Sequence, residues 1–147
     1  MNQNDWMNLL FTPAVPAKPA APNGIVFGNI SFTEPSRFSF FLPPFNCGGL
    51  YAILVPDTTA KPRPFRVIYF GESGELAKRV CPGHEKHSDW VREAGGADAL
   101  FVSFHTMTGD KDERVALESR LIADYKPACN DIFNSYYGEL GRFFWQK

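Results

Sequence analysis

Five side chains in the middle of the chain carry groups that can hold an anion, accept a proton or bind a cation. Arg79 can grip phosphate oxygens through its planar fork, and Lys78 beside it adds a second positive charge. Glu118 offers carboxylate oxygens, the ligands that hard cations such as Mg²⁺ and Mn²⁺ prefer. Tyr51 and Tyr69 carry phenols, whose pKa of about 10 makes them bases at neutral pH only where positive charge stabilises the phenolate.

Each of these residues also has an ordinary structural explanation. A tyrosine packs well at the end of a strand, where its hydroxyl reaches water. Glu118 falls on an apolar helical stripe and could simply be neutralised by Arg79 or another base, because a buried carboxylate needs a partner. Taken singly, none of these side chains establishes a function, so their order along the chain matters more.

A second arrangement of reactive side chains lies in the stretch CPGHEKH. Its residues Cys81, His84 and His87 stand at intervals of three and could bind Zn²⁺, with Cys47 or Cys129 as a fourth ligand. The paired CxxC spacing typical of structural zinc sites is missing, so zinc binding is the minor alternative.

Two nearly continuous apolar runs, residues 50–55 and 65–70, position the tyrosines. Such runs are typical of strands covered on both faces, and the loop between them has turn chemistry. If Val55 pairs with Phe65, Tyr51 stands directly opposite Tyr69 on one face of an antiparallel pair. A register slip of one residue would turn one phenol to the other face.

Short elements follow this hairpin. We expect a helix over residues 74–80 with Arg79 on its last turn, and a second helix from about residue 88 to the glycine pair 95–96. Residues 99–107 then have the composition of a third strand.

The longest helix should position Glu118. It is predicted to begin at Asp110, which with Glu113 forms a capping box, and to end near Tyr125, before a proline. Glu118 falls on the stripe expected to face the core. The apolar members of this stripe are Val115, Leu121, Ile122 and Tyr125.

Taken together, residues 48–130 resemble the GIY-YIG nuclease superfamily. The two name-giving triplets read Gly49, Leu50, Tyr51 and then Tyr69, Phe70, Gly71. After the second triplet, ESGELAKR places Arg79 where the family has an arginine, and His84 lies just beyond it. The stretch ALESRLIADYKPACN supplies Glu118, Pro127 and Asn130, which is the most specific part of the match.

The resemblance implies a fold, an activity and a set of site residues. The fold is a small α/β domain with a three-stranded antiparallel or mixed central sheet flanked by helices. The activity is metal-dependent endonuclease cleavage of DNA phosphodiesters, with Mg²⁺ or Mn²⁺ held by Glu118 and with Tyr51 deprotonating water. The implied catalytic residues are Tyr51, Tyr69, Arg79, His84, Glu118 and Asn130, and the implied phosphate contacts are Lys78 and Arg79.

For two of these residues, the sequence itself indicates other roles. Asn130 is expected to be structural, tying the chain after the long helix to the site. His84 could be a base, a phosphate contact or an exposed histidine. The alternative to an active nuclease is a catalytically weak or inactive nucleic-acid-binding or regulatory module with the same fold.

The charge distribution bears on this alternative. Residues 61–92 hold seven Lys or Arg against four Asp or Glu, a local charge of +3, which suits phosphate recognition. The remainder of the chain is then −4, because the formal net charge is −1. An acidic remainder and the lack of a visible DNA-recognition domain favour the binding or regulatory module.

Length and composition predict one domain with extended ends. The chain has 147 residues, 44% of them hydrophobic, and the odd count of three cysteines favours reduced thiols. No membrane span or secretory signal is evident, so we expect a cytoplasmic protein. Residues 1–45 are predicted to be a proline-spaced tether with an aromatic extension, residues 46–130 the nuclease domain, and residues 131–147 an aromatic segment. These aromatic ends should pack on the core or form a homo-oligomer.

Overall fold

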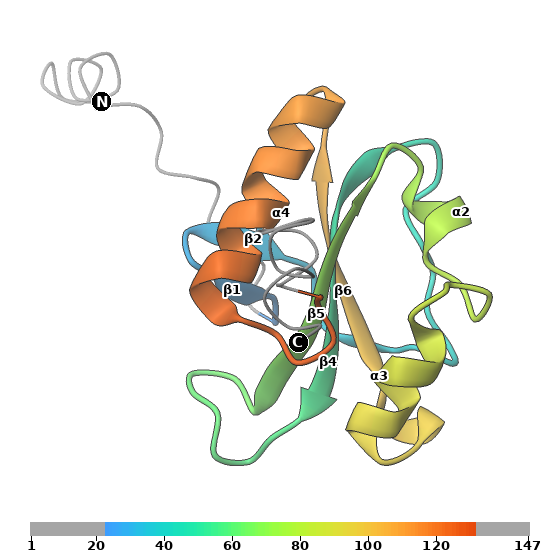
Figure 1. The fold of residues 1–147 in the computed structure, drawn as a ribbon, viewed down its shortest axis with the longest axis vertical. Helices are drawn as coiled ribbons and strands as arrows, with labels where there is room; N and C mark the ends of the chain where they lie inside the picture. Colours follow the sequence, from blue (N-terminus) through green and yellow to red (C-terminus); the bar gives the residue numbers. More distant parts are fainter. Residues whose placement is uncertain (1–22, 132–147) are drawn as a thin grey trace, which may run out of the picture.

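A four-stranded antiparallel sheet forms the centre of the fold in the computed structural model, which describes residues 23–131 (Figure 1). Helices and a two-stranded hairpin cover the two faces of this sheet, so the predicted mixed α/β class is confirmed. The strands, in their order across the sheet, are β3 (Ser36–Arg37), β6 (Phe101–Met107), β4 (Gly48–Pro56) and β5 (Phe65–Ser73).

The predicted count of three strands is one too few. The three expected strands are β4, β5 and β6, and every pairing in the sheet is antiparallel. The fourth strand, β3, pairs Ser36 with Val102 and Arg37 with Phe101. Two residues are too few to produce an alternating pattern, so no periodicity marks this strand in the sequence.

The register of β4 and β5 differs from the prediction that Tyr51 stands directly opposite Tyr69. Tyr51 pairs with Gly71, and Tyr69 pairs with Ile53. The two tyrosines are therefore diagonal neighbours, with ring centroids 6.0 Å apart. They still share one face of the sheet, because a shift of two residues preserves the direction of a side chain.

This two-residue shift has two separate causes. Phe65 pairs with Pro56 rather than with Val55, so the hairpin loop is shorter than expected. A further register shift occurs between Ile53 and Leu54, where the ladder is irregular. Each irregularity displaces the pairing by one residue. Because the two shifts add up to two residues, Tyr51 and Tyr69 remain on the same face of the sheet.

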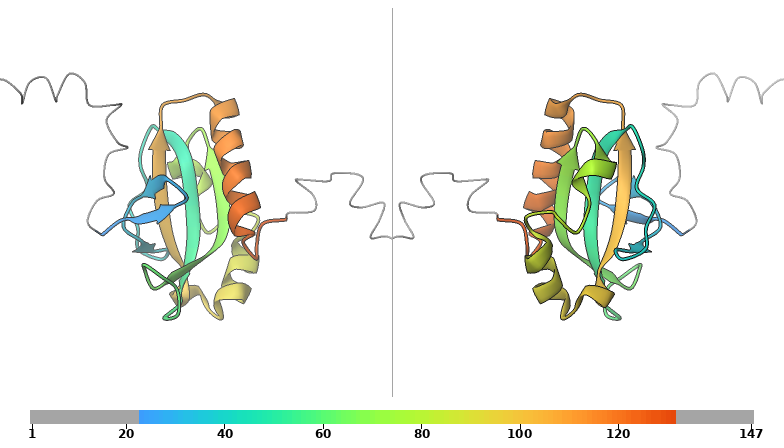
Figure 2. Two further views of the ribbon diagram at one scale, coloured as in Figure 1. Left: turned by 90° about the vertical axis from the view of Figure 1, so that its left-hand side faces the viewer. Right: turned by 90° about the vertical axis from the view of Figure 1, so that its right-hand side faces the viewer.

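One face of the sheet is covered by the hairpin of β1 (Ile25–Phe27) and β2 (Ile30–Phe32) and by helix α4 (Lys111–Tyr125). Helix α4 lies along the β5 side of this face and the hairpin along the β6 side (Figure 2). The apolar residues buried between these elements are Ile25, Phe27, Ile30, Phe32, Leu50, Ala52, Leu54, Val67, Phe70, Leu121 and Ile122. The hairpin thus covers the core, as expected of the aromatic stretch that contains it.

The opposite face is covered by helices α2 (Leu76–Arg79) and α3 (His87–Ala94), with a short 3₁₀ turn at Ala97–Ala99 (Figure 1). Trp90 of α3 is buried at the centre of this layer. The other buried apolar residues here are Phe38, Tyr51, Ile53, Val55, Ile68, Leu76, Val80, Leu100, Val102 and Phe104. The predicted short helices and third strand are therefore present, with ends shifted by a few residues.

Helix α4 begins as predicted but buries a narrower stripe. The Asp110 side chain accepts a hydrogen bond from the Glu113 backbone N–H (3.0 Å), which caps the helix. Val115 is exposed, contrary to the prediction. Its neighbour Arg114 faces the sheet instead and pairs with Glu72 of β5 (Nε to Oε2, 3.0 Å).

The segment between β3 and β4 is only partly covered, although the aromatic extension within residues 1–45 was predicted to pack on the core or a second subunit. Phe38 is buried, and Phe41 packs against Phe104 with ring centroids 5.9 Å apart. The side chains that remain largely exposed are Phe40, Leu42 and Phe45. The predicted tether and the C-terminal aromatic segment lie outside the described residues, apart from Asp131. Within residues 23–131, no helix has the length and apolar character needed to cross a membrane.

Candidate active site

Tyr51 lies at the centre of the site and is fully buried, with 0% of its surface exposed. Its ring crosses the backbone of β5 at Gly71, so closely that a Cβ atom there would overlap the phenol. A glycine is required at residue 71 for this reason. Burial raises the pKa of Tyr51 above its ordinary value of 10.0, nearby Tyr69 raises it further, and Arg79 lowers it.

His84 holds the Tyr51 hydroxyl from the segment between α2 and α3. Its Nε2 lies 2.8 Å from the Tyr51 oxygen, while its Nδ1 accepts the backbone N–H of Lys86 (3.0 Å). A neutral ring that accepts at Nδ1 carries its proton on Nε2, so His84 donates to Tyr51. Burial and then the charge of Arg79 lower the pKa of His84 from 6.5 to about 4, which keeps the ring neutral. The exposed-histidine interpretation of His84 is therefore wrong.

Tyr69 is the more accessible of the two tyrosines, because it is only partly buried. Its ring packs against Trp90, with centroids 5.1 Å apart, and against His84 at 5.6 Å. Burial raises the pKa of Tyr69, interaction with Tyr51 lowers it, and the negative charge of Glu118 raises it. The phenol thus lies beside the buried Tyr51 and within electrostatic reach of the carboxylate of the long helix.

Arg79 connects the parts of the site electrostatically. Its positive charge lowers the pKa values of Tyr51, Tyr69 and Glu118, as well as that of His84. Its guanidinium forms two hydrogen bonds to Glu85, from Nη1 to Oε2 (2.7 Å) and from Nη2 to Oε1 (2.5 Å). The side chain remains 37% exposed, so its charge faces both the buried phenols and solvent.

Glu118 reaches this cluster from α4, on the other face of the sheet. Because β5 is an edge strand, side chains from both faces can meet around it. Burial and the nearby charge of Glu72 raise the pKa of Glu118 from 4.5 to about 7. The Glu72 backbone N–H donates a hydrogen bond to Glu118, and together with Arg79 it partly offsets this shift.

The oxygen donors at Glu118 suit a hard divalent cation. A carboxylate that is partly desolvated and faces a second carboxylate, Glu72, gains from a nearby positive charge. Arg114 forms an ion pair with Glu72. Of the two carboxylates, Glu118 is therefore the one that remains available to a cation. Within residues 23–131 no cluster of three such ligands surrounds it, so Glu118 would be the single protein ligand of a Mg²⁺ or Mn²⁺, as the resemblance implies, and the metal stays a prediction.

Asn130 has the structural role that its place after the helix predicted. Its Oδ1 accepts the backbone N–H of Phe70 (2.8 Å), and its Nδ2 donates to the Phe70 carbonyl (2.9 Å). These bonds satisfy the edge of β5 between Tyr69 and Gly71. Asn130 therefore fixes the backbone that carries two site residues.

Lys78 is not brought into the cluster around Arg79. Its side chain is largely exposed, and its ammonium pairs with Glu75 one turn earlier (2.8 Å). A phosphate contact from Lys78 stays a prediction.

The zinc alternative finds no support in the geometry. Both ring nitrogens of His84 are occupied, by Tyr51 and by the Lys86 backbone. His87 packs its ring against Phe38, with centroids 5.4 Å apart. Across residues 23–131, no three His, Cys, Asp or Glu side chains gather closely enough to hold a metal ion together.

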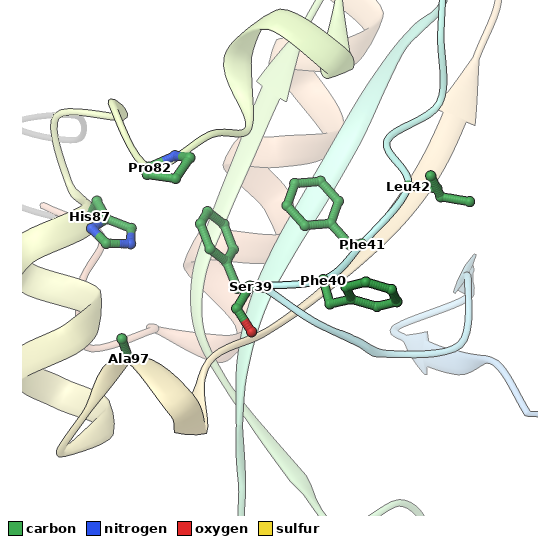
Figure 3. A pocket seen from close by; sticks show the side chains of 8 residues that line it. Ser39, Phe40, Phe41, Leu42, Pro82, His87 and Ala97 are labelled. Atoms are coloured by element: carbon green, nitrogen blue, oxygen red, sulfur yellow. The ribbon is translucent and has the colours of Figure 1, made fainter.

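A largely apolar pocket of about 550 Å³ opens beside the His84 segment. Figure 3 shows Pro82 and His87 on one side of it and Phe41, Phe40 and Leu42 on the other. The sequence indicated neither this pocket nor the roles of Glu72 and Glu85. Glutamates in turns and at strand ends are common, and only the fold shows that these two face Glu118 and Arg79.

Comparisons of the chain with models of protein families, with curated proteins and with solved structures find no match.

Proposed function

We propose that this chain is a metal-dependent endonuclease of the GIY-YIG type, which hydrolyses phosphodiester bonds of nucleic acid, with DNA as the first substrate to test. One observation carries the proposal. Residues from four separate segments, namely Tyr51, Tyr69, His84 and Glu118, all lie within electrostatic reach of the single guanidinium of Arg79. Phosphoryl transfer needs an anion clamp and a cation ligand close together, and Arg79 and Glu118 are the side chains that could supply them.

Glu118 is the proposed ligand of the divalent cation. A bound Mg²⁺ or Mn²⁺ supplies positive charge that stabilises the phosphoryl oxygens and the leaving oxygen. Because the pKa of Glu118 is about 7, cation binding competes with a proton at this carboxylate and strengthens as the pH rises through neutrality.

Arg79 is the proposed phosphate contact, since its planar fork matches two phosphate oxygens. Of the two phenols, Tyr69 is the one that solvent reaches, whereas Tyr51 is fully buried behind it. We therefore assign contact with the attacking water to Tyr69, rather than to Tyr51 as the resemblance implies, and assign to Tyr51 the role of supporting the Tyr69 ring. His84 is a positioning residue, because it fixes the Tyr51 hydroxyl by donating from Nε2.

A second candidate is a nucleic-acid-binding or regulatory module with weak or no cleavage activity. Two observations favour it: Tyr51 is fully buried, and the hydrogen-bonding fork of Arg79 is already engaged by Glu85. A module of this kind would bind nucleic acid without metal-dependent cleavage.

Cleavage of supercoiled plasmid DNA separates these candidates. We expect the purified chain to nick or linearise plasmid in Mg²⁺ or Mn²⁺, to stop in EDTA, and to lose about 100-fold or more of its rate on Glu118→Gln. Glu113→Gln, on the exposed start of the same helix, is the matched control and should retain the rate. Cleavage that persists in EDTA, or an unaffected Glu118→Gln variant, would overturn the metal assignment. DNA binding without cleavage in either metal would establish the second candidate.

A further inference from the structure

The fork of Arg79 holds a carboxylate in the arrangement that it would use for a phosphate. Two guanidinium nitrogens each donate to a different oxygen of Glu85, at 2.7 and 2.5 Å. Carboxylates and phosphates are both recognised by arginine through two parallel hydrogen bonds of this kind. The pKa of Glu85 is lowered to about 2, chiefly by these bonds, so the occupant is anionic at neutral pH.

We propose that Glu85 is an internal competitor for the phosphate site, which closes Arg79 in the free protein and is displaced by a substrate phosphate. The inference rests on the proposed function, because it takes Arg79 to be the phosphate contact. Glu85 is then a gate on substrate affinity. Only an anion that can replace both of its oxygens opens the site.

The surroundings of Glu85 allow its side chain to move without the segment that carries it. The preceding residue, His84, is buried and anchored at both ring nitrogens, by Tyr51 and by the Lys86 backbone. The Glu85 side chain is 61% exposed and can rotate into water from this fixed backbone. Displacement therefore needs a change of rotamer only, and the Tyr51 position is kept.

The exposure of the Arg79–Glu85 ion pair to water determines how strongly Glu85 competes with phosphate. An ion pair in contact with water contributes little stability, and a bidentate pair lies at the upper end of that range. A competitor of this strength reduces the fraction of free Arg79, and hence the apparent affinity for phosphate, by about two- to fivefold.

The test compares variants by binding, so that cleavage is not needed as a readout. The probe is a fluorescein-labelled forked DNA with both a duplex and a single-stranded arm, titrated at low salt in EDTA and followed by anisotropy. Glu85→Gln removes the charge, and Glu85→Asp keeps the charge on a shorter arm that no longer reaches both nitrogens. We expect both to bind about two- to fivefold more tightly than the wild type.

Glu75→Gln is the matched control. Glu75 lies one helical turn before Arg79, and its carboxylate pairs with Lys78 rather than with the fork. This variant removes the same charge from the same surface and also frees Lys78, so its effect is an upper limit on what general repulsion contributes to Glu85→Gln. In an Arg79→Gln background, the gain from Glu85→Gln should vanish.

The outcomes distinguish this inference from the proposed function. Metal-dependent cleavage and DNA binding by the wild type, with no gain in the Glu85 variants beyond that of Glu75→Gln, would overturn the gate and leave the nuclease intact. A gain in Glu85→Gln without one in Glu85→Asp would attribute the effect to charge alone and would also overturn it. If neither the wild type nor any Glu85 variant binds the probe, the gate and the proposed function both fail.

Discussion

The burial of His84 predicts how the stability of the folded protein changes with pH, whether or not the protein has enzymatic activity. His84 has a fully buried side chain and a pKa lowered to about 4, against 6.5 when it is exposed. As the pH falls below 6.5, the unfolded chain takes up a proton at this ring, but the folded protein does not until about pH 4. The contribution of His84 to stability is therefore present above pH 6.5 and is lost progressively as the pH falls toward 4.

The magnitude follows from these two values. At pH 5 the unfolded state has gained about 2 kcal/mol from protonation at this site, and near pH 4 the full difference approaches about 3 kcal/mol. His84→Gln removes the titration and costs a constant amount for lost packing and for the bond to Tyr51. The wild type should therefore exceed the variant in stability by about 2 kcal/mol more at pH 7.5 than at pH 5.

Urea unfolding of both proteins at half-unit intervals between pH 7.5 and 5 measures this difference. The charged side chains that act on His84, including Arg79 and Glu85, are present in both proteins, so their direct contributions largely cancel in the comparison. Tyr51→Phe keeps the ring buried and should retain most of the pH slope, because burial is the largest cause of the shift. A constant difference between wild type and His84→Gln across this range would refute the assignment of a buried neutral imidazole.

Two further substitutions and a deletion test the architecture of the site and of the fold. Gly71→Ala should lower the free energy of unfolding by about 1–3 kcal/mol, because its Cβ would overlap the Tyr51 phenol, and an unchanged urea midpoint would contradict this. Asn130→Ala should cost about 1–3 kcal/mol and speed hydrogen exchange at the Phe70 amide; unaltered exchange there would show that the bond is dispensable. Deleting residues 1–45 removes the hairpin that covers one face of the sheet, so we expect insoluble or strongly destabilised protein, and a stable soluble fragment would show that the hairpin is not needed.

The order of the main elements could be predicted because local signals marked them. Asp110 three residues before Glu113 marked the start of α4, and the glycine pair marked the end of α3. The strand β3 could not be predicted, since two residues carry no periodicity. Val115 was assigned to the buried stripe by spacing, yet the sheet beside it presents Glu72, which selects Arg114 as its partner instead.

The candidate site was predictable as a set of residue types but not as a geometry. The sequence indicated that Tyr51 and Tyr69 share one face, and they do, although the hairpin reaches this arrangement through two irregularities rather than by direct pairing. It did not indicate Glu72 or Glu85, because the partner of an exposed glutamate depends on which side chains the fold brings near it. The contact of Glu85 with two nitrogens of Arg79 is therefore visible only in the structure.

The position of β5 at the edge of the sheet explains how residues from opposite faces can act together. Tyr51 and Tyr69 lie on the face covered by α2 and α3, whereas α4 brings Glu118 to the other face. In the middle of a sheet, the backbone of the sheet would separate groups on opposite faces. At the edge strand β5, side chains from the two faces can meet around one strand. Asn130 closes that edge with two hydrogen bonds at Phe70 and so prevents another strand from pairing there. The same residue thus protects the exposed edge and fixes the backbone on which the phenols and the carboxylate converge.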